Sequence, residues 1–162
     1  MMKVRVVLLL IIALLVGACA EGQRAIEPPI IRYGEDQCAE CGMIISDARF
    51  AAGYLHEVSA GRYVSLIFDD IGDMLHHADK NPTHRIQAWY VHDYADETWL
   101  DATAAFYVIS QEIHTPMGHG IAAHGEREAA VALATATNGE LVDWAGLQLH
   151  FESGGMAHSH SH

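Results

Sequence analysis

Two cysteines and a methionine lie close together in Asp36-Gln37-Cys38-Ala39-Glu40-Cys41-Gly42-Met43, which we call the clip. Thiolate and thioether sulfurs are soft ligands that suit Cu(I), zinc or iron–sulfur centres, and a combination of Cys with Met favours Cu(I). If the backbone from Cys41 to Met43 is extended, both side chains point to the same side and both sulfurs can face one ion. Gly42 between them allows a tight bend or a close approach of the backbone. We therefore expect the clip to bind metal.

The Cys-x-x-Cys spacing of Cys38 and Cys41 indicates metal or redox chemistry without deciding between the two. A structural zinc ion needs four ligands, and the sequence has no second cysteine pair, although two histidines could complete the set. A thioredoxin-like site would follow a buried strand and open a helix, whereas this pair follows a proline-containing segment. In an oxidising compartment the two thiols could also form a disulfide. Zinc, redox chemistry and a disulfide therefore stay open beside copper.

A further sulfur lies in the turn-forming run from His114 to Gly120, which we call the Met117 loop. Pro116 presets a turn and Gly118 can close it. Met117 at the tip either presents its sulfur or caps a small core, because methionine often fills gaps. His114 and His119 flank Met117 and are the best candidates for an added nitrogen ligand. Four other histidines of the body are expected to be surface or structural residues: His76, His77, His84 and His92. Three are undecided: His56, His124 and His150.

The start of the chain predicts export. A positively charged beginning precedes Val6–Val16, an apolar run of 11 residues. This run is short for a bilayer span, which needs about 20 residues, but it fits the apolar part of a signal peptide. Val16-Gly17-Ala18-Cys19 then resembles a lipobox. We expect residues 1–18 to be a lipoprotein signal peptide and Cys19 to carry lipid, with an ordinary signal peptide and a free Cys19 as the alternative.

These features predict an extracytoplasmic, membrane-anchored lipoprotein, periplasmic or on the outer cell surface. The 162-residue chain has a formal charge of −12, and loss of residues 1–18 removes two cations and no acid, which gives −14. So acidic a chain argues against nucleic acid as a partner and favours cations and basic partner surfaces. The sequence contains no catalytic-base motif, Gly-rich phosphate loop or serine nucleophile elbow, so we do not expect an enzyme.

The body predicts an α+β fold of two small modules that follow a flexible tether. Residues 19–36 hold the acylated cysteine and the tether, since the Pro28-Pro29 pair and its polar neighbours cannot build a core. The first module, residues 37–95, carries the clip, strands at 50–58 and 62–68, a helix capped by Asp69 that ends before Asn81-Pro82, and a strand at 85–92.

The second module, residues 96–150, is expected to repeat this ββαβ order. Strands are expected near 98–102, at 105–110 and at 120–124, and a helix is expected from 126 to about 137, ending at Asn138-Gly139. Residues 140–149 are expected to be extended in part. Residues 151–162 are expected to form a flexible His-rich tail, either a native segment that gathers metal weakly or the remnant of a purification tag.

Three segments give the chain a resemblance to a known family. They are Cys41-Gly42-Met43, Phe68-Asp69-Asp70 at the start of the first helix, and Thr115-Pro116-Met117-Gly118 in the second module. With the lipobox, they resemble the NosL family, lipoprotein copper chaperones that accompany nitrous oxide reductase. The resemblance covers about Gln37 to Leu149, and its specific parts are the Cys-Gly-Met and Pro-Met-Gly segments.

The resemblance implies treble-clef-like modules, similar to part of the organomercurial lyase fold. It implies a shallow site for Cu(I), carried as cargo, with Cys41, Met43 and Met117 as ligands and His119 or water in a fourth position. Cys38 is a further ligand, a disulfide partner of Cys41 in the apo form, or merely present. The implied partners are nitrous oxide reductase or another cuproprotein and a membrane ABC-type accessory complex. A His-rich tail is not part of the family pattern.

The favoured function is therefore a copper chaperone that exchanges ligands with its client. An under-coordinated site near the surface lets a partner's ligand add before an old ligand leaves. The alternative, from a different class, is an anchored structural-zinc or thiol–disulfide module that holds a partner. An enzymatic role by analogy with the lyase would rest on the fold alone.

Overall fold

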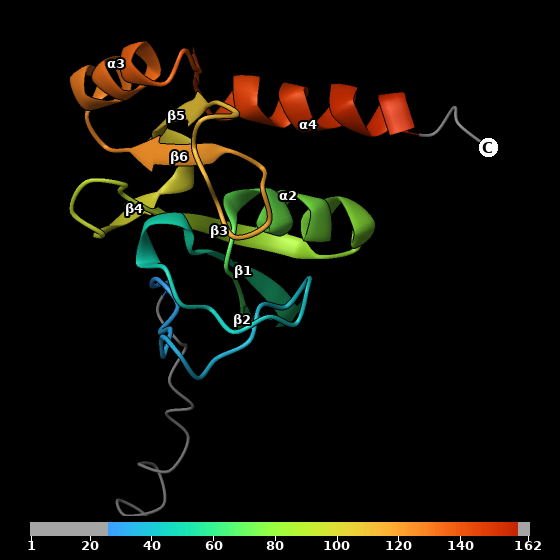
Figure 1. Ribbon diagram of the computed structural model, residues 1–162. Coiled ribbons are helices and arrows are strands. Elements are labelled where there is room, and N and C mark those ends of the chain that lie inside the picture. The colour runs from blue at the N-terminus through green and yellow to red at the C-terminus, as the bar shows by residue number, and fades with distance from the viewer. Residues whose placement is uncertain (1–25, 159–162) are drawn as a thin grey trace, which may run out of the picture.

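Two small antiparallel sheets frame the computed structural model, which describes residues 26–158 (Figure 1). Three α-helices accompany the sheets within these residues, so the expected α+β class is confirmed. The order strand, strand, helix, strand occurs once around each sheet. The predicted signal peptide, the acylated Cys19 and the last histidines of the tail lie outside the described residues.

The first sheet has the strand order β2-β1-β3-β4, with antiparallel neighbours throughout. Aromatic and branched side chains stabilise this pairing, as where Tyr54 lies between Leu66 and Trp89. The fourth strand was expected in the second module, but it pairs with β3, so the first sheet extends beyond residue 95. The elements are η1 (Ala48–Phe50), β1 (Ala52–Ser59), β2 (Arg62–Phe68), β3 (Arg85–His92), β4 (Trp99–Asp101) and η2 (Ala102–Ala104).

Helix α2 (Ile71–Lys80) follows β2 directly and ends before the Asn81-Pro82 pair that predicted its end. Its N-cap is Asp70, whose Oδ1 accepts a hydrogen bond of 2.9 Å from the Gly72 N–H. The prediction of Asp69 as the cap is therefore wrong by one residue. Both aspartates are suited to capping, but the helix begins at Ile71, so the Asp69 side chain is available for other contacts.

The second sheet has the order β6-β5-β7, with β5 (Phe106–Ile109) antiparallel to both neighbours. Helix α3 (Arg127–Ala136) joins β6 (Ile121–His124) to β7 (Glu140–Val142). The alanines of α3 favour a helix. Asn138, just after the helix, has a positive φ of 46°, a conformation that terminates helices. The prediction of a helix near 126–137 is confirmed.

Helix α4 (Trp144–His158) was not predicted from the sequence. Residues 140–149 were expected to be extended in part, which β7 confirms for 140–142. Residues 151–162 were expected to be flexible, yet one helix includes 144–158. Asp143 accepts a hydrogen bond of 2.8 Å from the Gly146 N–H, as an N-terminal cap does. Trp144, Leu147 and Phe151 are three and four residues apart, so one face of the helix packs on the core.

The larger of the two hydrophobic clusters among the described residues connects the two sheets. Leu147 of α4 and Tyr107 of β5 belong to the same buried cluster as Phe68 and Met74 of the first sheet and its helix. Met74 was expected in the core, and it is fully buried. A parallel bridge between Asp93 and Ala123 also joins the two sheets. The two halves therefore support each other through this shared cluster, and a smaller cluster gathers Phe50 with residues of the second sheet and α3.

The last part of the expected tether packs against the first sheet. Pro29 is buried over Gly53, where an added Cβ would come within 2.7 Å of the Pro29 Cγ atom. Tyr33 places its hydroxyl 3.1 Å from the Nε2 atom of His92. Because Ile31 also packs on the core, the apolar residues of this segment explain why it does not remain a free tether.

Two buried histidines make stability depend on pH. Burial lowers the pKa of His92 and of His124 below the usual 6.5. The unfolded chain then binds more protons than the folded chain just below pH 6.5, so the free energy of unfolding falls as the pH drops. We expect a loss of roughly 1–2 kcal/mol from these two groups between about pH 7.5 and about pH 5.5 in urea unfolding. His124→Leu should remove part of this loss, and an unchanged pH profile would contradict the assignment.

Candidate metal centre

The clip is a tight hairpin turn rather than an extended segment. A bridge pairs Gln37 with Ile44. The Cys38 N–H donates to the Met43 carbonyl at 2.8 Å, and the Gly42 N–H donates to the Cys38 carbonyl at 3.0 Å. Gly42 has a φ of +75°, which a side chain would strain. The extended backbone considered for Cys41 to Met43 is therefore not found, and the tight bend that Gly42 allows instead brings the two thiols together.

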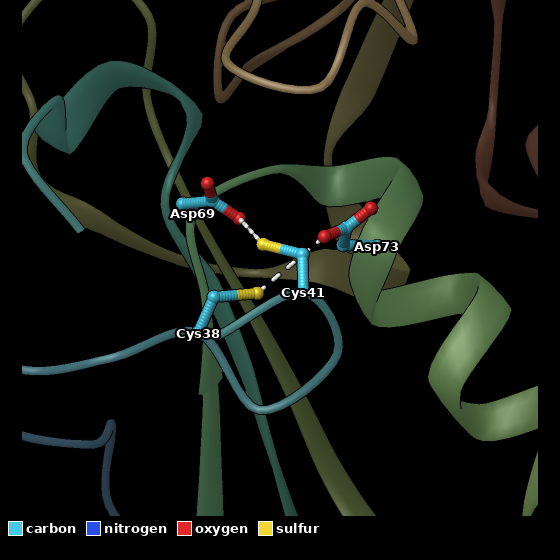
Figure 2. Close-up of side chains that lie close together, drawn as sticks. All are labelled: Cys38, Cys41, Asp69 and Asp73. Atoms are coloured by element: carbon cyan, nitrogen blue, oxygen red, sulfur yellow. Dashed lines mark hydrogen bonds between the residues drawn. The ribbon is translucent and has the colours of Figure 1, made fainter. Parts of the chain in front are cut away.

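Two carboxylates face the two thiols (Figure 2). Cys38 donates from Sγ to Asp73 Oδ2 at 3.4 Å, and Cys41 donates from Sγ to Asp69 Oδ1 at 3.5 Å. One ligand atom from each of these four residues lies within 4.8 Å of all the others. Both thiols are free, so the structure describes the reduced state of the pair. Asp69 follows β2 and Asp73 lies in the first turn of α2, so the sheet, the helix and the clip meet here.

Burial affects the protonation of the two thiols in this cluster. Burial raises the pKa of the Cys38 thiol and of the Cys41 thiol, so both are protonated at neutral pH in the absence of metal. The Asp69 and Asp73 side chains are buried, and Asp69 Oδ2 has no hydrogen-bond partner among the described residues. A buried carboxylate oxygen without a partner is costly. A bound cation would supply that partner and would replace the thiol protons.

Asp69 and Asp73 were not among the predicted ligands. Asp69 was assigned only to the helix cap, and Asp73 only to a favourable charge at the helix start. Their position at the predicted start of one helix was a usable signal, because it places both carboxylates near the point where the strand ends and the helix begins. That signal could not show which face the clip would cover, since the hairpin contacts the helix through tertiary packing.

The Met117 loop of the second module reaches the same helix start (Figure 1). Asp70 Oδ2 accepts hydrogen bonds from the Thr115 hydroxyl at 2.6 Å and from the Met117 N–H at 3.1 Å. His119 Nε2 lies 3.1 Å from Asp73 Oδ1. One buried aspartate thus fastens the loop to the helix, and a second one connects His119 to the thiol cluster.

The structure brings some predicted ligands together in the four-residue cluster and leaves others exposed at the protein surface. Cys38 is buried with 3% of its surface exposed, and Cys41 is half-buried. His119 reaches the cluster through Asp73. Met43 and Met117 are 51% and 39% exposed, and neither belongs to the four-residue cluster. Of the two roles weighed for Met117, exposure favours the presented sulfur over a cap on a small core.

Gly72 allows His119 to approach the helix. A Cβ at this position would lie 2.2 Å from the Cγ atom of His119. Alanine in place of a helical glycine normally stabilises by about 0.5–1 kcal/mol, but we expect Gly72→Ala to destabilise by about 1–3 kcal/mol through overpacking. Chemical denaturation would measure this change, with Gly146→Ala in α4 as a comparison. A stabilising Gly72→Ala would show that His119 moves aside without cost.

The arrangement can hold metal in two ways. The two thiols with the Asp69 and Asp73 carboxylates make a mixed sulfur and oxygen set, which zinc accepts. The predicted set of the thiols with the exposed sulfurs of Met43 and Met117 is a soft one, of the kind that Cu(I) prefers. The first set is already gathered, while the second lies partly at the surface, where an ion and a partner can reach it.

Known proteins resemble this chain in sequence and in fold. The model of the NosL family matches residues 30–150. The copper-binding lipoprotein NosL of Stutzerimonas stutzeri is 30% identical over 161 residues, which cover 90% of this chain and 80% of that protein. The crystal structure of the copper chaperone NosL from Shewanella denitrificans matches with a TM-score of 0.61 and 21% identity, covering 73% of this chain and 92% of that one. At that identity the structural match shows a shared fold.

No helix among the described residues is both long and apolar enough to cross a membrane.

Proposed function

The chain belongs to the NosL family, and from this premise we propose that it is a membrane-anchored, extracytoplasmic chaperone that carries Cu(I) to a cuproenzyme. Nitrous oxide reductase is the first candidate client, and another cuproprotein is the second. The observation that carries the proposal is the docking of the Met117 loop, through Asp70, beside the free thiols of the clip. Sulfur ligands from both modules can thereby serve one ion.

In this proposal each sulfur has a separate role. Cys41, half-buried at the clip, is the anionic anchor, and binding of Cu(I) releases its proton. Met43 and Met117 supply neutral sulfurs at the exposed rim. A ligand of the client can add to the ion from this side before a methionine leaves, so copper passes without being released. Cys38 supports the turn from its buried position and is a further ligand when the ion lies deep.

The predicted lipobox and the name of one relative support the anchoring. The relative from Stutzerimonas stutzeri is named a copper-binding lipoprotein. Cys19, placed after an apolar run and small residues, would carry the lipid. An anchored carrier would keep its cargo near a membrane ABC-type accessory complex, the second partner that we propose. The names of the relatives describe binding and chaperone functions, which supports a role without catalysis.

Methionine variants test the proposed ligand set. We expect one Cu(I) per chain in an anaerobic titration against a chromogenic chelator, using the reduced chain without residues 1–19. The tail histidines should be replaced by serine, because removal of the tail would shorten α4. Met43→Leu and Met117→Leu should each weaken Cu(I) binding by roughly tenfold, or about 1.4 kcal/mol. Met74→Leu is the matched control, because Met74 is fully buried in the core and should leave the affinity unchanged.

The runner-up function is a structural-zinc or thiol–disulfide module that holds a partner. The two carboxylates beside the thiols favour it, because they complete a four-ligand set without either methionine. The same titration with Zn(II) distinguishes this function from that of a copper chaperone. Tight Zn(II) binding that Asp69→Asn weakens and that both methionine variants leave unchanged would replace the chaperone proposal with this one.

A further inference from the structure

Three histidines from separate elements gather around one buried tyrosine, away from the clip. His56 lies on β1, His77 on α2 and His84 in the turn before β3, and we call them the histidine cluster. The hydroxyl of Tyr54 lies 2.8 Å from His77 Nδ1 and 2.9 Å from His84 Nδ1. The His56 ring stacks on the His84 ring with centroids 4.0 Å apart. All three histidines are half-buried, so solvent reaches them.

We propose that the histidine cluster is a second metal site, separate from the clip, that binds a divalent transition-metal ion through the imidazoles of His56 and His84. Imidazole nitrogen suits Cu(II) and Zn(II), and Cu(II) is bound more tightly in general. The proposal does not depend on Cu(I) binding at the clip, because the two sites share no ligand.

The hydrogen bonds indicate which nitrogen of His84 carries a lone pair. The amide nitrogen of Asn81 can only donate, and it lies 3.4 Å from His77 Nδ1. His77 Nδ1 is then an acceptor, and it takes the single hydroxyl proton of Tyr54. His84 Nδ1 must therefore donate its own proton to the Tyr54 oxygen. That tautomer leaves His84 Nε2 with a free lone pair.

This is the arrangement of a metal-binding histidine. Such a histidine commonly donates its other ring N–H to a fixed oxygen, which orients the ring and makes the ligating nitrogen more basic. Here Tyr54 supplies that oxygen and His77 holds the hydroxyl in place. His77 and Tyr54 are therefore positioning residues, and His56 and His84 are the ligands. Neither ring nitrogen of His56 has a hydrogen-bond partner within residues 26–152, so His56 can turn out of the stack and ligate.

The surrounding charges do not oppose a cation. Glu57 pairs with Arg85 at 3.7 Å beside the cluster, and Glu40 pairs with Lys80 on the other side. The positive charges of Arg85 and Lys80 are thus each paired with a carboxylate, and the whole chain has a formal charge of −12.

Cu(II) binding to the full chain in detergent tests the site. Cys38→Ser and Cys41→Ser remove the clip thiols, and serine at positions 158, 160 and 162 removes the tail histidines. We expect one Cu(II) per chain, with imidazole nitrogen coordination in pulsed electron paramagnetic resonance. His56→Ala or His84→Ala should weaken binding at least about tenfold, since loss of even an outer partner costs about 10–100-fold. Tyr54→Phe should weaken it while keeping the nitrogen signal.

His76→Ala is the control, because His76 is exposed on α2 and its ring contacts those of His119 and Phe151, outside the histidine cluster. Equal weakening by His76→Ala, or Cu(II) binding that neither His56→Ala nor His84→Ala changes, would overturn the proposal. A second measurement covers variants that fail to fold. Zn(II) added to the unmodified chain should shift the imidazole proton resonances of His56 and His84 in nuclear magnetic resonance spectra. Shifts confined to other histidines would overturn the proposal.

Discussion

Cys41→Ser should produce the largest loss of Cu(I) affinity among single substitutions, roughly a hundredfold or more, or about 2.7 kcal/mol. Cys41 is the half-buried thiol of the clip, with Sγ 3.5 Å from Asp69 Oδ1. Serine keeps the turn and a hydrogen-bond donor, but it replaces an anionic soft ligand by a neutral hard one. The methionines, being neutral, contribute less each. Anaerobic competition with a chromogenic Cu(I) chelator measures the effect.

Cys38→Ser is the informative partner variant. Cys38 has only 3% of its surface exposed and belongs to the hydrophobic core cluster. Its replacement should cost about 1–3 kcal/mol of stability, because a hydroxyl is buried in its place, and it should lower Cu(I) affinity less than Cys41→Ser does. Equal losses of affinity in both variants would show that the ion lies between the two thiols, and no loss in Cys41→Ser would remove the clip from the copper site.

Asp70→Ala should cause the second large effect, on stability and on the copper site together. Asp70 is fully buried and accepts from the Gly72 N–H, the Thr115 hydroxyl and the Met117 N–H. Three donors lose their acceptor, and each unsatisfied donor costs about 1–3 kcal/mol. Because water can partly replace the lost acceptor, we expect the free energy of unfolding to fall by about 3–5 kcal/mol. Urea unfolding measures this loss. Asp101→Ala, which removes an exposed cap of η2, should cost only about 1 kcal/mol.

A double-mutant cycle connects this loss to the site. Asp70 holds the Met117 loop against α2, so without it Met117 is no longer positioned for the ion. Met117→Leu should therefore weaken Cu(I) binding in the parent chain and have little further effect in the Asp70→Ala chain. Additive effects of the two substitutions would show that Asp70 stabilises the fold without positioning Met117.

The order of the elements could be predicted because it depends on local patterns. Residues 62–68 and 85–92 are rich in branched and aromatic side chains, and Asn81-Pro82 limits the helix between them. The turn around Met117 was predictable for the same reason, since Pro116 and Gly118 act on their own neighbours. The observed α2, β3 and exposed Met117 agree with these patterns.

Other features depend on tertiary contacts and could not be predicted in this way. Asp69 and Asp70 are equally good caps, and only the position where α2 begins decides which of them faces the thiols. Asp73 becomes part of the cluster because the clip folds over the helix start. The start of α4 was visible in Asp143 and in the spacing of Trp144, Leu147 and Phe151, but short strand-like stretches of the same residues concealed it.

The core that runs through both sheets has a consequence for how the chain opens. Since Leu147 and Tyr107 pack in the same cluster as Phe68, neither half can lose its packing without exposing the other. Backbone amides of β5 and of β1 should then exchange with solvent through the same cooperative opening. An ion that binds only the folded state raises the free energy of that opening. Binding of a metal ion at the clip should therefore slow amide exchange in the distant second sheet by the same factor as in the first sheet.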